Sequence, residues 1–170
     1  MKNIVKALTM TLILSTSYII GQDTSNTINN SGKFILTVIG FESNEGKAMI
    51  AIFNSEEDYS ETGEKFKSIA LEIEDQKCEW IIDDLPYGEY AIKLFHDENG
   101  NGKMDRNMLG IPSEDYGFSN NASGSFGPAD YEDAKFIFNT TGQQHEINLD
   151  WYRDNDEEFN FIFYTYSFYF

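Results

Sequence analysis

The chain is poor in the residues on which several common kinds of chemistry depend. It has one cysteine and two histidines, so Cys78 has no internal disulfide partner, and a zinc site built from Cys and His side chains is disfavoured. Basic residues are also scarce. Twelve Lys and Arg stand against 29 Asp and Glu, a formal net charge of −17. Such a chain repels nucleic acid and anionic lipid and attracts cations.

Catalytic motifs are also missing, since no GxSxG, HExxH, Walker or CxxC pattern occurs. His96 stands beside Asp97, so a base oriented by a carboxylate is conceivable, but nothing in the spacing brings Ser119 or Ser123 to it as a nucleophile. Carboxylate pairs for glycoside hydrolysis are uninformative among 29 acidic residues. We therefore expect no enzyme. A periplasmic hydrolase or carbohydrate-active enzyme is the alternative.

Proline is the last scarce residue, with three in the chain, whereas aromatic residues make up 15%. This combination is typical of a chain rich in strands. Hydrophobic residues make up 41%, enough for a core, and 170 residues favour one domain.

Residues 1–21 have the layout of a secretory signal peptide. Lys2 and Lys6 precede an apolar run over 7–20, which is shorter than the roughly 20 residues that a membrane helix needs. We expect cleavage after Gly21, a secreted, periplasmic or cell-envelope location, and no integral membrane segment after processing; an uncleaved anchor is the alternative. Residues 22–32 are polar and predict a flexible lead-in.

Apolar residues alternate with period two over residues 33–152, and this pattern predicts that the folded domain covers this range. We expect ESNEG at 42–46 to be a hairpin turn, and Asn54 or Ser55 to begin one or two helical turns before residue 67. The predicted strands cover 33–41, 47–53, 68–74, 77–82, 84–95, 133–138 and 144–151. This indicates an all-β protein, a seven-stranded antiparallel β-sandwich with one long ordered loop.

The run DLPYGEYAIKLF marks a corner of this fold. Leu85 can plug the end of the sandwich, and the Tyr90 hydroxyl needs a backbone partner at the rim. The run resembles the corner of transthyretin-like and collagen-adhesin-B-type sandwiches, which are Ig-like folds. Cys78 alternates with apolar residues that point inward and is expected to be a small buried hydrophobe.

The long loop at 96–127 carries a calcium-loop pattern, DxNxNGxxD. Alternate side chains of a tightly curled segment converge on one point, which suits a hard cation, and glycine at position 6 permits the sharp turn. The expected ligands at positions 1, 3, 5, 7 and 9 are Asp97, Asn99, Asn101, the carbonyl of Lys103, and Asp105.

Position 12 departs from the EF-hand pattern, because Met108 replaces the bidentate glutamate. A seven-coordinate ion needs further oxygen, for which the candidates are Glu98, Glu114, Asp115, Asp130, Glu132 and Asp133. Two carboxylates and two amides predict weak Ca²⁺ binding, at roughly 10⁻⁴ to 10⁻³ M. Magnesium suits so adaptable a loop less well. The alternative is a turn without an ion, in which Asn and Gly only supply positive φ.

The second half of the loop presents Ser119, Asn120 and Asn121, which we expect at the surface. A polar and aromatic platform there could bind a glycan or a protein ligand at the cell envelope. In the alternative, these side chains tie the loop to the rest of the protein.

Five segments together resemble the DUF2141 family of secreted bacterial proteins: IGFESNEGKAMIAIFNSEEDY, DLPYGEYAIKLF, HDENGNGKMD, GIPSEDYGFSNNASG and FGPADYEDAKF. The resemblance covers residues 33–149. It implies an exported single sandwich and no mechanism, since the family has no established activity. Ser123 departs from the basic residue that members often carry there.

Residues 153–170 form an acidic and then aromatic tail, ending FNFIFYTYSFYF. We expect an added edge strand; a sticky tail or a shifted reading frame are the alternatives. The sequence as a whole predicts an exported non-enzymatic module for binding or envelope association with a Ca²⁺-ordered loop. A purely structural domain without an ion is a further alternative.

Overall fold

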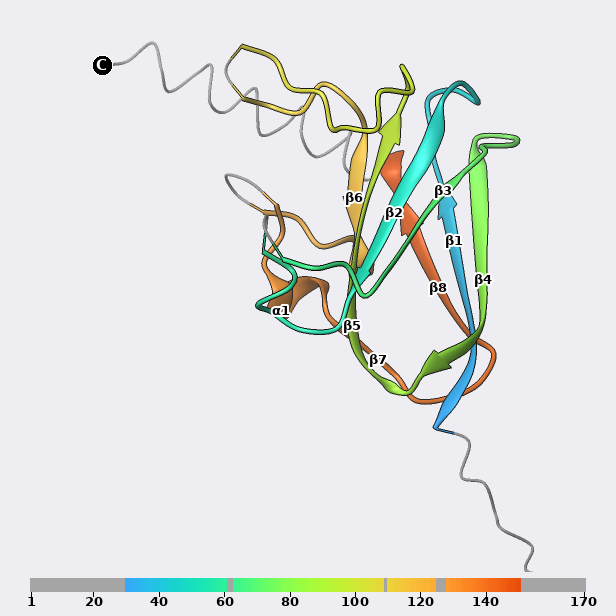
Figure 1. Ribbon diagram of the computed structural model, residues 1–170. Coiled ribbons are helices and arrows are strands. Elements are labelled where there is room, and N and C mark those ends of the chain that lie inside the picture. The colour runs from blue at the N-terminus through green and yellow to red at the C-terminus, as the bar shows by residue number, and fades with distance from the viewer. Residues whose placement is uncertain (1–29, 61–62, 109, 125–127, 151–170) are drawn as a thin grey trace, which may run out of the picture.

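The computed structural model describes residues 30–60, 63–108, 110–124 and 128–150, which are coloured in Figure 1. The expected signal peptide and the aromatic tail lie outside the described residues, as does most of the expected lead-in.

The described chain is mostly β, as expected, and its strands form two sheets (Figure 1). One sheet has the order β4-β1-β8 and the other β3-β2-β5-β6, with β7 paired to the start of β5. The strands are β1 (Ser31–Ile39), β2 (Lys47–Phe53), β3 (Lys67–Leu71), β4 (Lys77–Pro86), β5 (Gly88–Asp97), β6 (Tyr116–Phe118), β7 (Phe136–Phe138) and β8 (Gln143–Asn148). A 3₁₀ turn, η1 (Ser119–Asn121), and a short helix, α1 (Tyr131–Ala134), complete the elements.

The strand inventory differs from the expectation in two respects. The described residues hold eight strands instead of seven, because β6 forms inside the long loop. The expectation of purely antiparallel pairing is wrong for β1 and β8, which pair in parallel from Phe34↔Gln143 to Ile39↔Asn148. The reason is that the chain leaves β7 in the second sheet and returns to the first, so β8 runs in the direction of β1.

The expected hairpin at 42–46 is also wrong, because β1 and β2 belong to different sheets. Gly46 (φ +71°) lies so close to the end of β5 that an added Cβ would be 2.1 Å from the carbonyl oxygen of Asp97. The segment is therefore a crossing between layers. Asp75 and Gln76, which separate the predicted strands at 68–74 and 77–82, form a turn in which both residues have positive φ.

Two further predicted segments, the helical turn after residue 54 and the strand at 133–138, can be compared with the structure. Asp58 N–H donates to Ser55 Oγ at 3.2 Å and Tyr59 N–H to the Ser55 carbonyl at 3.0 Å, which makes one capped helical turn. The strand expected at 133–138 is α1 followed by β7, because acidic residues favour the first turn of a helix. Among the described residues no helix is long and apolar enough to span a bilayer.

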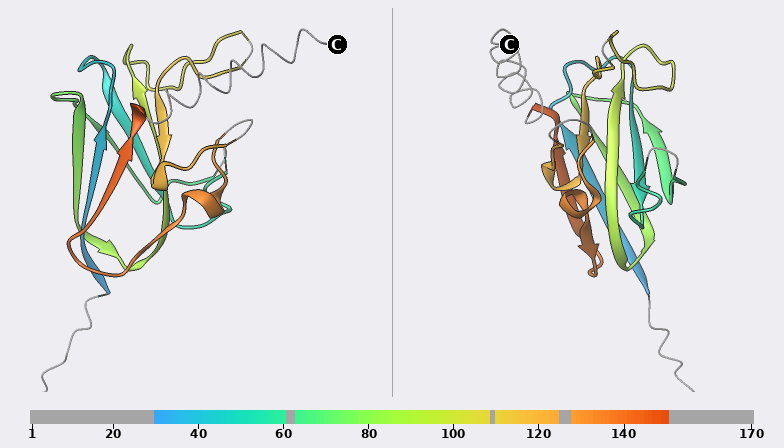
Figure 2. Two further views of the ribbon diagram at one scale, coloured as in Figure 1. Left: turned by 180° about the vertical axis from the view of Figure 1, so that it is seen from behind. Right: turned by 90° about the vertical axis from the view of Figure 1, so that its left-hand side faces the viewer.

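The core lies between the sheets and is built from alternate residues of the strands. The right-hand view of Figure 2 shows β8 and β5 in separate layers. Burying each large apolar side chain contributes roughly 1.5–3 kcal/mol. Residues at most 3% exposed include Phe34, Leu36, Val38, Ile50, Ile52, Leu85, Ile92, Leu94 and Ile147.

Two expectations about single core residues are confirmed. Cys78 is buried, and this burial raises the pKa of its thiol to about 12, so the sulfur acts as an apolar group. The Tyr90 hydroxyl donates to the carbonyl of Pro86 at 2.8 Å, which fixes the corner between β4 and β5.

Candidate metal centre

The predicted calcium loop begins at the last residue of β5, at the end of the molecule where Figure 1 shows the loops above β5 and β6. Asp97 is only 3% exposed. Its carboxylate accepts hydrogen bonds from the backbone N–H groups of Asn101 at 3.0 Å and Gly102 at 2.8 Å. These bonds curl the chain around the first predicted ligand.

The side chains at the third, fifth and ninth positions of the pattern meet at one point. The Asn99 amide donates to the Asp105 carboxylate at 2.5 Å, and the Asn101 amide donates to both oxygens of that carboxylate at 3.1 Å. Asp105 therefore lies within hydrogen-bond distance of both asparagines. These three side chains of the pattern lie together, with the amide nitrogens and not the amide oxygens toward Asp105, and their coordination of an ion stays a prediction.

The amide oxygens of the two asparagines shape the backbone of the loop. Asn99 Oδ1 accepts from the N–H of Asn101 at 3.0 Å, and Asn101 Oδ1 accepts from the N–H of Lys103 at 2.7 Å. Gly100 and Gly102 have φ of +71° and +74°, and no heavy atom lies within 4 Å of a Cβ added at either. Glycine is required there by backbone conformation and not by lack of space.

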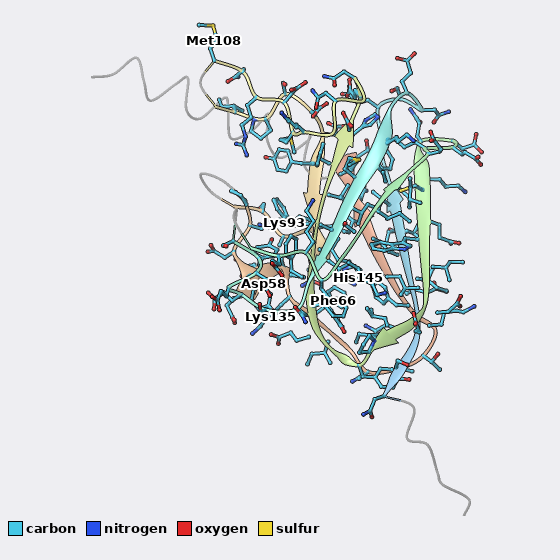
Figure 3. All side chains as sticks on the ribbon, in the orientation of Figure 1. Asp58, Phe66, Lys93, Met108, Lys135 and His145 are labelled. Atoms are coloured by element: carbon cyan, nitrogen blue, oxygen red, sulfur yellow. The ribbon has the colours of Figure 1, made fainter. Side chains whose placement is uncertain are left out.

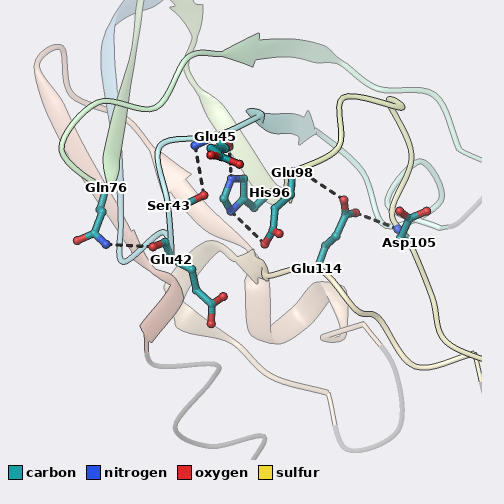
Figure 4. Close-up of polar contacts among 8 residues, drawn as sticks. All are labelled: Glu42, Ser43, Glu45, Gln76, His96, Glu98, Asp105 and Glu114. Carbon is teal, nitrogen blue, oxygen red and sulfur yellow. Dashed lines mark hydrogen bonds and ion pairs between the residues drawn. The ribbon is translucent and has the colours of Figure 1, made fainter.

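Glu114 closes the loop from outside the pattern. It is 7% exposed, and its two carboxylate oxygens accept from the N–H groups of Glu98 at 3.2 Å and Asp105 at 2.9 Å (Figure 4). Met108, at the position of the missing glutamate, is fully exposed and points away from the body of the protein (Figure 3). Glu114 is thus the candidate acid whose carboxylate binds the backbone of the loop.

The other candidate acids have different neighbours. Glu132 pairs with Lys135 at 2.8 Å, and Asp130 and Asp133 belong to the same region around α1. The Asp115 backbone carbonyl accepts from His96 N–H at 2.8 Å. Within the described residues, no three His, Cys, Asp or Glu side chains are arranged to hold a metal. An ion in this loop would therefore need amide and carbonyl oxygens as well as carboxylates.

His96 is fully buried at the base of the loop. Its Nε2 lies 2.6 Å from the carbonyl oxygen of Glu45, and because a carbonyl only accepts, Nε2 carries the hydrogen (Figure 4). Nδ1 then lacks a hydrogen-bond partner among the described residues and lies 3.7 Å from a Glu98 carboxylate oxygen. The ring packs edge-on against Phe41 at 5.2 Å. His96 thus joins the crossing at 42–46 to β5.

The expected surface position is wrong for Ser119, which is fully buried. Its hydroxyl accepts from the N–H of Ile92 at 2.9 Å and donates to the carbonyl of Ala134 at 2.5 Å. Ser119 lies at the start of η1, and its hydroxyl supplies the partner that two backbone groups in the interior of the protein need. Both of these hydrogen bonds are to backbone groups of β5 and α1, and neither is to His96.

Asn120 is exposed, as expected, but its side chain binds other parts of the protein. Its amide donates to the carbonyls of Asp133 at 3.0 Å and Lys135 at 2.8 Å. Asn121 is half-buried, and its Oδ1 accepts from the N–H of Asn148 in β8 at 3.0 Å. These contacts match the alternative in which the side chains tie the loop down.

Sequence reasoning missed His145 as the partner of this segment. The N–H of Asn120 donates to His145 Nε2 at 3.1 Å, and the imidazole stacks on Phe136 with centroids 4.4 Å apart. Burial lowers the pKa of His145 below the usual 6.5, so the neutral ring that accepts this bond is favoured. No short-range pattern could have shown the contact, because 25 residues separate the partners.

Two sheets around one core, with a self-bonded acidic and amide-rich loop at one end, define a small β-protein with a candidate cation-binding loop. The family model of DUF2141, described as "Uncharacterized protein conserved in bacteria", matches residues 36–147. The chain belongs to this family, which confirms the resemblance drawn from its motifs. Neither a curated protein nor a solved structure matches the chain.

Proposed function

We propose that this protein is an exported, non-enzymatic β-sandwich module of the cell envelope, of the Ig-like or transthyretin-like kind, whose loop is ordered by Ca²⁺. The observation that carries the proposal is the meeting of Asn99 and Asn101 at the carboxylate of Asp105. The side chains at positions 3, 5 and 9 of a calcium-loop pattern thus already lie together, although the asparagines now face Asp105 with their amide nitrogens.

The predicted ligands retain free lone pairs for an ion. Each oxygen of Asp97 accepts one backbone N–H, and Oδ1 of each asparagine also accepts one. A carboxylate has about four lone-pair sites and an amide oxygen two. The hydrogen bonds that shape the loop therefore leave capacity for coordination by the side chains, and the Lys103 carbonyl can add a fifth ligand.

Electrostatics also favours a cation at this place. Asp97 and Asp105 carry like charges within one loop of a protein whose formal charge is −17, and a divalent cation between them offsets their repulsion. Only two in-loop carboxylates take part. The expected affinity is therefore weak, at about 10⁻⁴ to 10⁻³ M, as in extracellular modules.

Thermal melting with and without calcium tests the proposal. At 100 times Kd, about 10 mM for a Kd of about 10⁻⁴ M, binding stabilises the folded state by about 2.7 kcal/mol. Asp105→Asn should lose this gain. Asp84→Asn, which removes the same charge from an exposed position on β4, should keep it. Magnesium at equal concentration controls for ionic strength.

A melting temperature that calcium leaves unchanged in the wild-type chain would favour the purely structural alternative. Equal increases in melting temperature with calcium in Asp105→Asn and Asp84→Asn would indicate that calcium binds at a site that does not include Asp105. Isothermal titration of the same three proteins gives the affinity directly.

The hydrolase alternative requires His96 as a base on the wall of the 96–127 loop. The Nε2 hydrogen of this residue is directed to the Glu45 carbonyl, and the Ser119 hydroxyl is directed to Ala134. Turnover of a glycan or ester panel by the wild-type chain, lost in His96→Gln, would replace the proposal.

Export is tested separately from calcium binding. Residues 1–21 support a cleaved signal peptide through their two lysines and the apolar run that follows. Amino-terminal sequencing of the protein from the cell envelope or medium should begin at Gln22. A chain that keeps its first residues would contradict processing, with no bearing on the loop.

A further inference from the structure

The candidate loop contains both Asn-Gly pairs of the chain, Asn99-Gly100 and Asn101-Gly102. In such a pair the backbone nitrogen of the glycine can attack the side-chain amide carbon of the asparagine. Glycine favours this attack because it has no Cβ to obstruct it and adopts many backbone conformations. Both asparagines are exposed, so water reaches them.

The two attacking nitrogens have different surroundings. Gly102 N–H donates to Asp97 Oδ2 at 2.8 Å, so the nitrogen is held by a buried carboxylate. Gly100 N–H makes no hydrogen bond with any described residue. Attack at Asn101 must first break a charge-assisted hydrogen bond, whereas attack at Asn99 requires no such step.

The amide oxygens of the two asparagines have similar partners, and both amide nitrogens donate to the Asp105 carboxylate. The oxygen of Asn99 accepts the N–H of Asn101, and the oxygen of Asn101 accepts the N–H of Lys103. Such a donor stabilises the negative charge that develops on the oxygen during attack. The pairs therefore form a natural comparison in which the glycine nitrogen is the main difference.

We propose that Asn99 is a deamidation site, and that the hydrogen bond from Gly102 to Asp97 protects Asn101. The Gly100 nitrogen forms a bond to Asn99 Cγ, the Cγ–Nδ2 bond breaks, and ammonia leaves with the proton from the glycine N–H. Water then opens the resulting succinimide. Opening at one carbonyl gives aspartate, and opening at the other gives isoaspartate.

The two products change the loop in opposite ways, a consequence that rests on the proposed calcium function. Aspartate at position 3 adds a third in-loop carboxylate, and calcium affinity rises with ligand charge. Isoaspartate adds a methylene to the backbone and displaces position 3 from the others. Deamidation would thus divide the protein into tighter and weaker binders.

Peptide mass spectrometry of the purified full chain tests the modification. The protein is incubated with chelator at neutral pH, either native or in urea, and the two sites are followed separately. In urea the two pairs should react at similar rates. In the native protein Asn99 should react about ten- to hundredfold faster than Asn101, the factor expected from a hydrogen bond to a charged group. A native ratio equal to that in urea would overturn the proposal.

Asp97→Ala tests the protection directly. It frees the Gly102 nitrogen, so the ratio of the Asn99 rate to the Asn101 rate should fall toward one. An unchanged ratio in this variant would overturn the assigned cause.

Calcium titration of Asn99→Asp separates this inference from the proposed function. The variant should bind roughly tenfold more tightly than the wild-type chain. If the native rate ratio holds but calcium binds neither protein, the modification stands and the calcium function fails. If calcium binds but the two asparagines react at equal rates in the native protein, the calcium function stands and the selective deamidation of Asn99 fails.

Discussion

The two halves of the long segment at 96–127 make different kinds of contact. In the first half, Asn99 and Asn101 bind Asp105, so a loop of nine residues is bonded to itself. In the second half, Ser119 and Asn120 bind β5, α1 and β8. The first half is therefore bonded mainly within itself, whereas the second half joins different elements of the fold.

This comparison separates two uses of polar residues. Exposed side chains that bond only within their own loop contribute little to folding, because water competes for the same groups, and their oxygens keep lone pairs that an ion could use. Buried side chains that satisfy backbone groups of other strands contribute to folding and are not available. Substitutions in the two halves should therefore affect different properties.

The largest expected effect is that of Ser119→Ala. It leaves the buried Ile92 N–H and Ala134 carbonyl without their partner, which should cost about 2–3 kcal/mol of unfolding free energy. Urea denaturation measures this as a lower midpoint. Ser123→Ala, at an exposed position, should stay within about 0.5 kcal/mol of the wild type. Equal losses in both variants would contradict the structural role of Ser119.

Glu114→Ala tests the boundary between the two halves. Its nearly buried carboxylate accepts two backbone N–H groups of the loop, so its removal should cost about 1–2 kcal/mol even without calcium. Glu114→Gln keeps one acceptor oxygen and should lose about half as much. A loss of unfolding free energy that appears only when calcium is present would instead indicate that Glu114 coordinates the ion and does not stabilise the loop through its backbone hydrogen bonds.

A matched pair of asparagine substitutions sharpens the comparison. Asn120→Ala removes two hydrogen bonds and places alanine at a φ of +61°, so it should cost about 1–2 kcal/mol. Asn99→Ala should cost less than about 0.5 kcal/mol in ion-free protein. In calcium titrations the order should reverse, with Asn99→Ala weakening binding and Asn120→Ala leaving it unchanged. If the same variant had the larger effect on both stability and calcium affinity, the two halves of the segment would not differ in role.

The sequence predicts that Asn99, Asn101 and Asp105 lie together because this information is local, whereas their binding of an ion stays a prediction. The spacing from Asp97 to Asp105 fixes which side chains can meet once glycine at position 6 bends the chain. The alternation in β1 likewise predicts which residues face the core, and Phe34, Leu36 and Val38 are all buried. The expected backbone partner of the Tyr90 hydroxyl is the carbonyl of Pro86, which is only four residues away in the sequence.

The contacts that the sequence could not predict join distant segments. The layer crossing at Gly46 depends on the end of β5, some fifty residues away. Ser119 looked like a surface residue because its partners, Ile92 and Ala134, are fixed only by the packing of β5 and α1. The parallel pairing of β8 with β1 depends on the path of the whole intervening chain.

The smallest expected effect is the pH dependence of the second half. Burial lowers the pKa of His145 from 6.5, and its neutral Nε2 accepts the Asn120 N–H. As the pH falls below the unfolded value of 6.5, the unfolded chain takes up a proton that the folded chain does not yet bind, so stability falls. The contribution is fully present above that value and is lost toward the lowered folded pKa.

His145→Gln keeps an acceptor that does not titrate in this range. Urea midpoints at about pH 7.5 and about pH 5.5 should therefore differ more in the wild-type chain than in this variant. If the midpoint difference between the two pH values is equal in both proteins, protonation of His145 does not weaken the contact between η1 and β8.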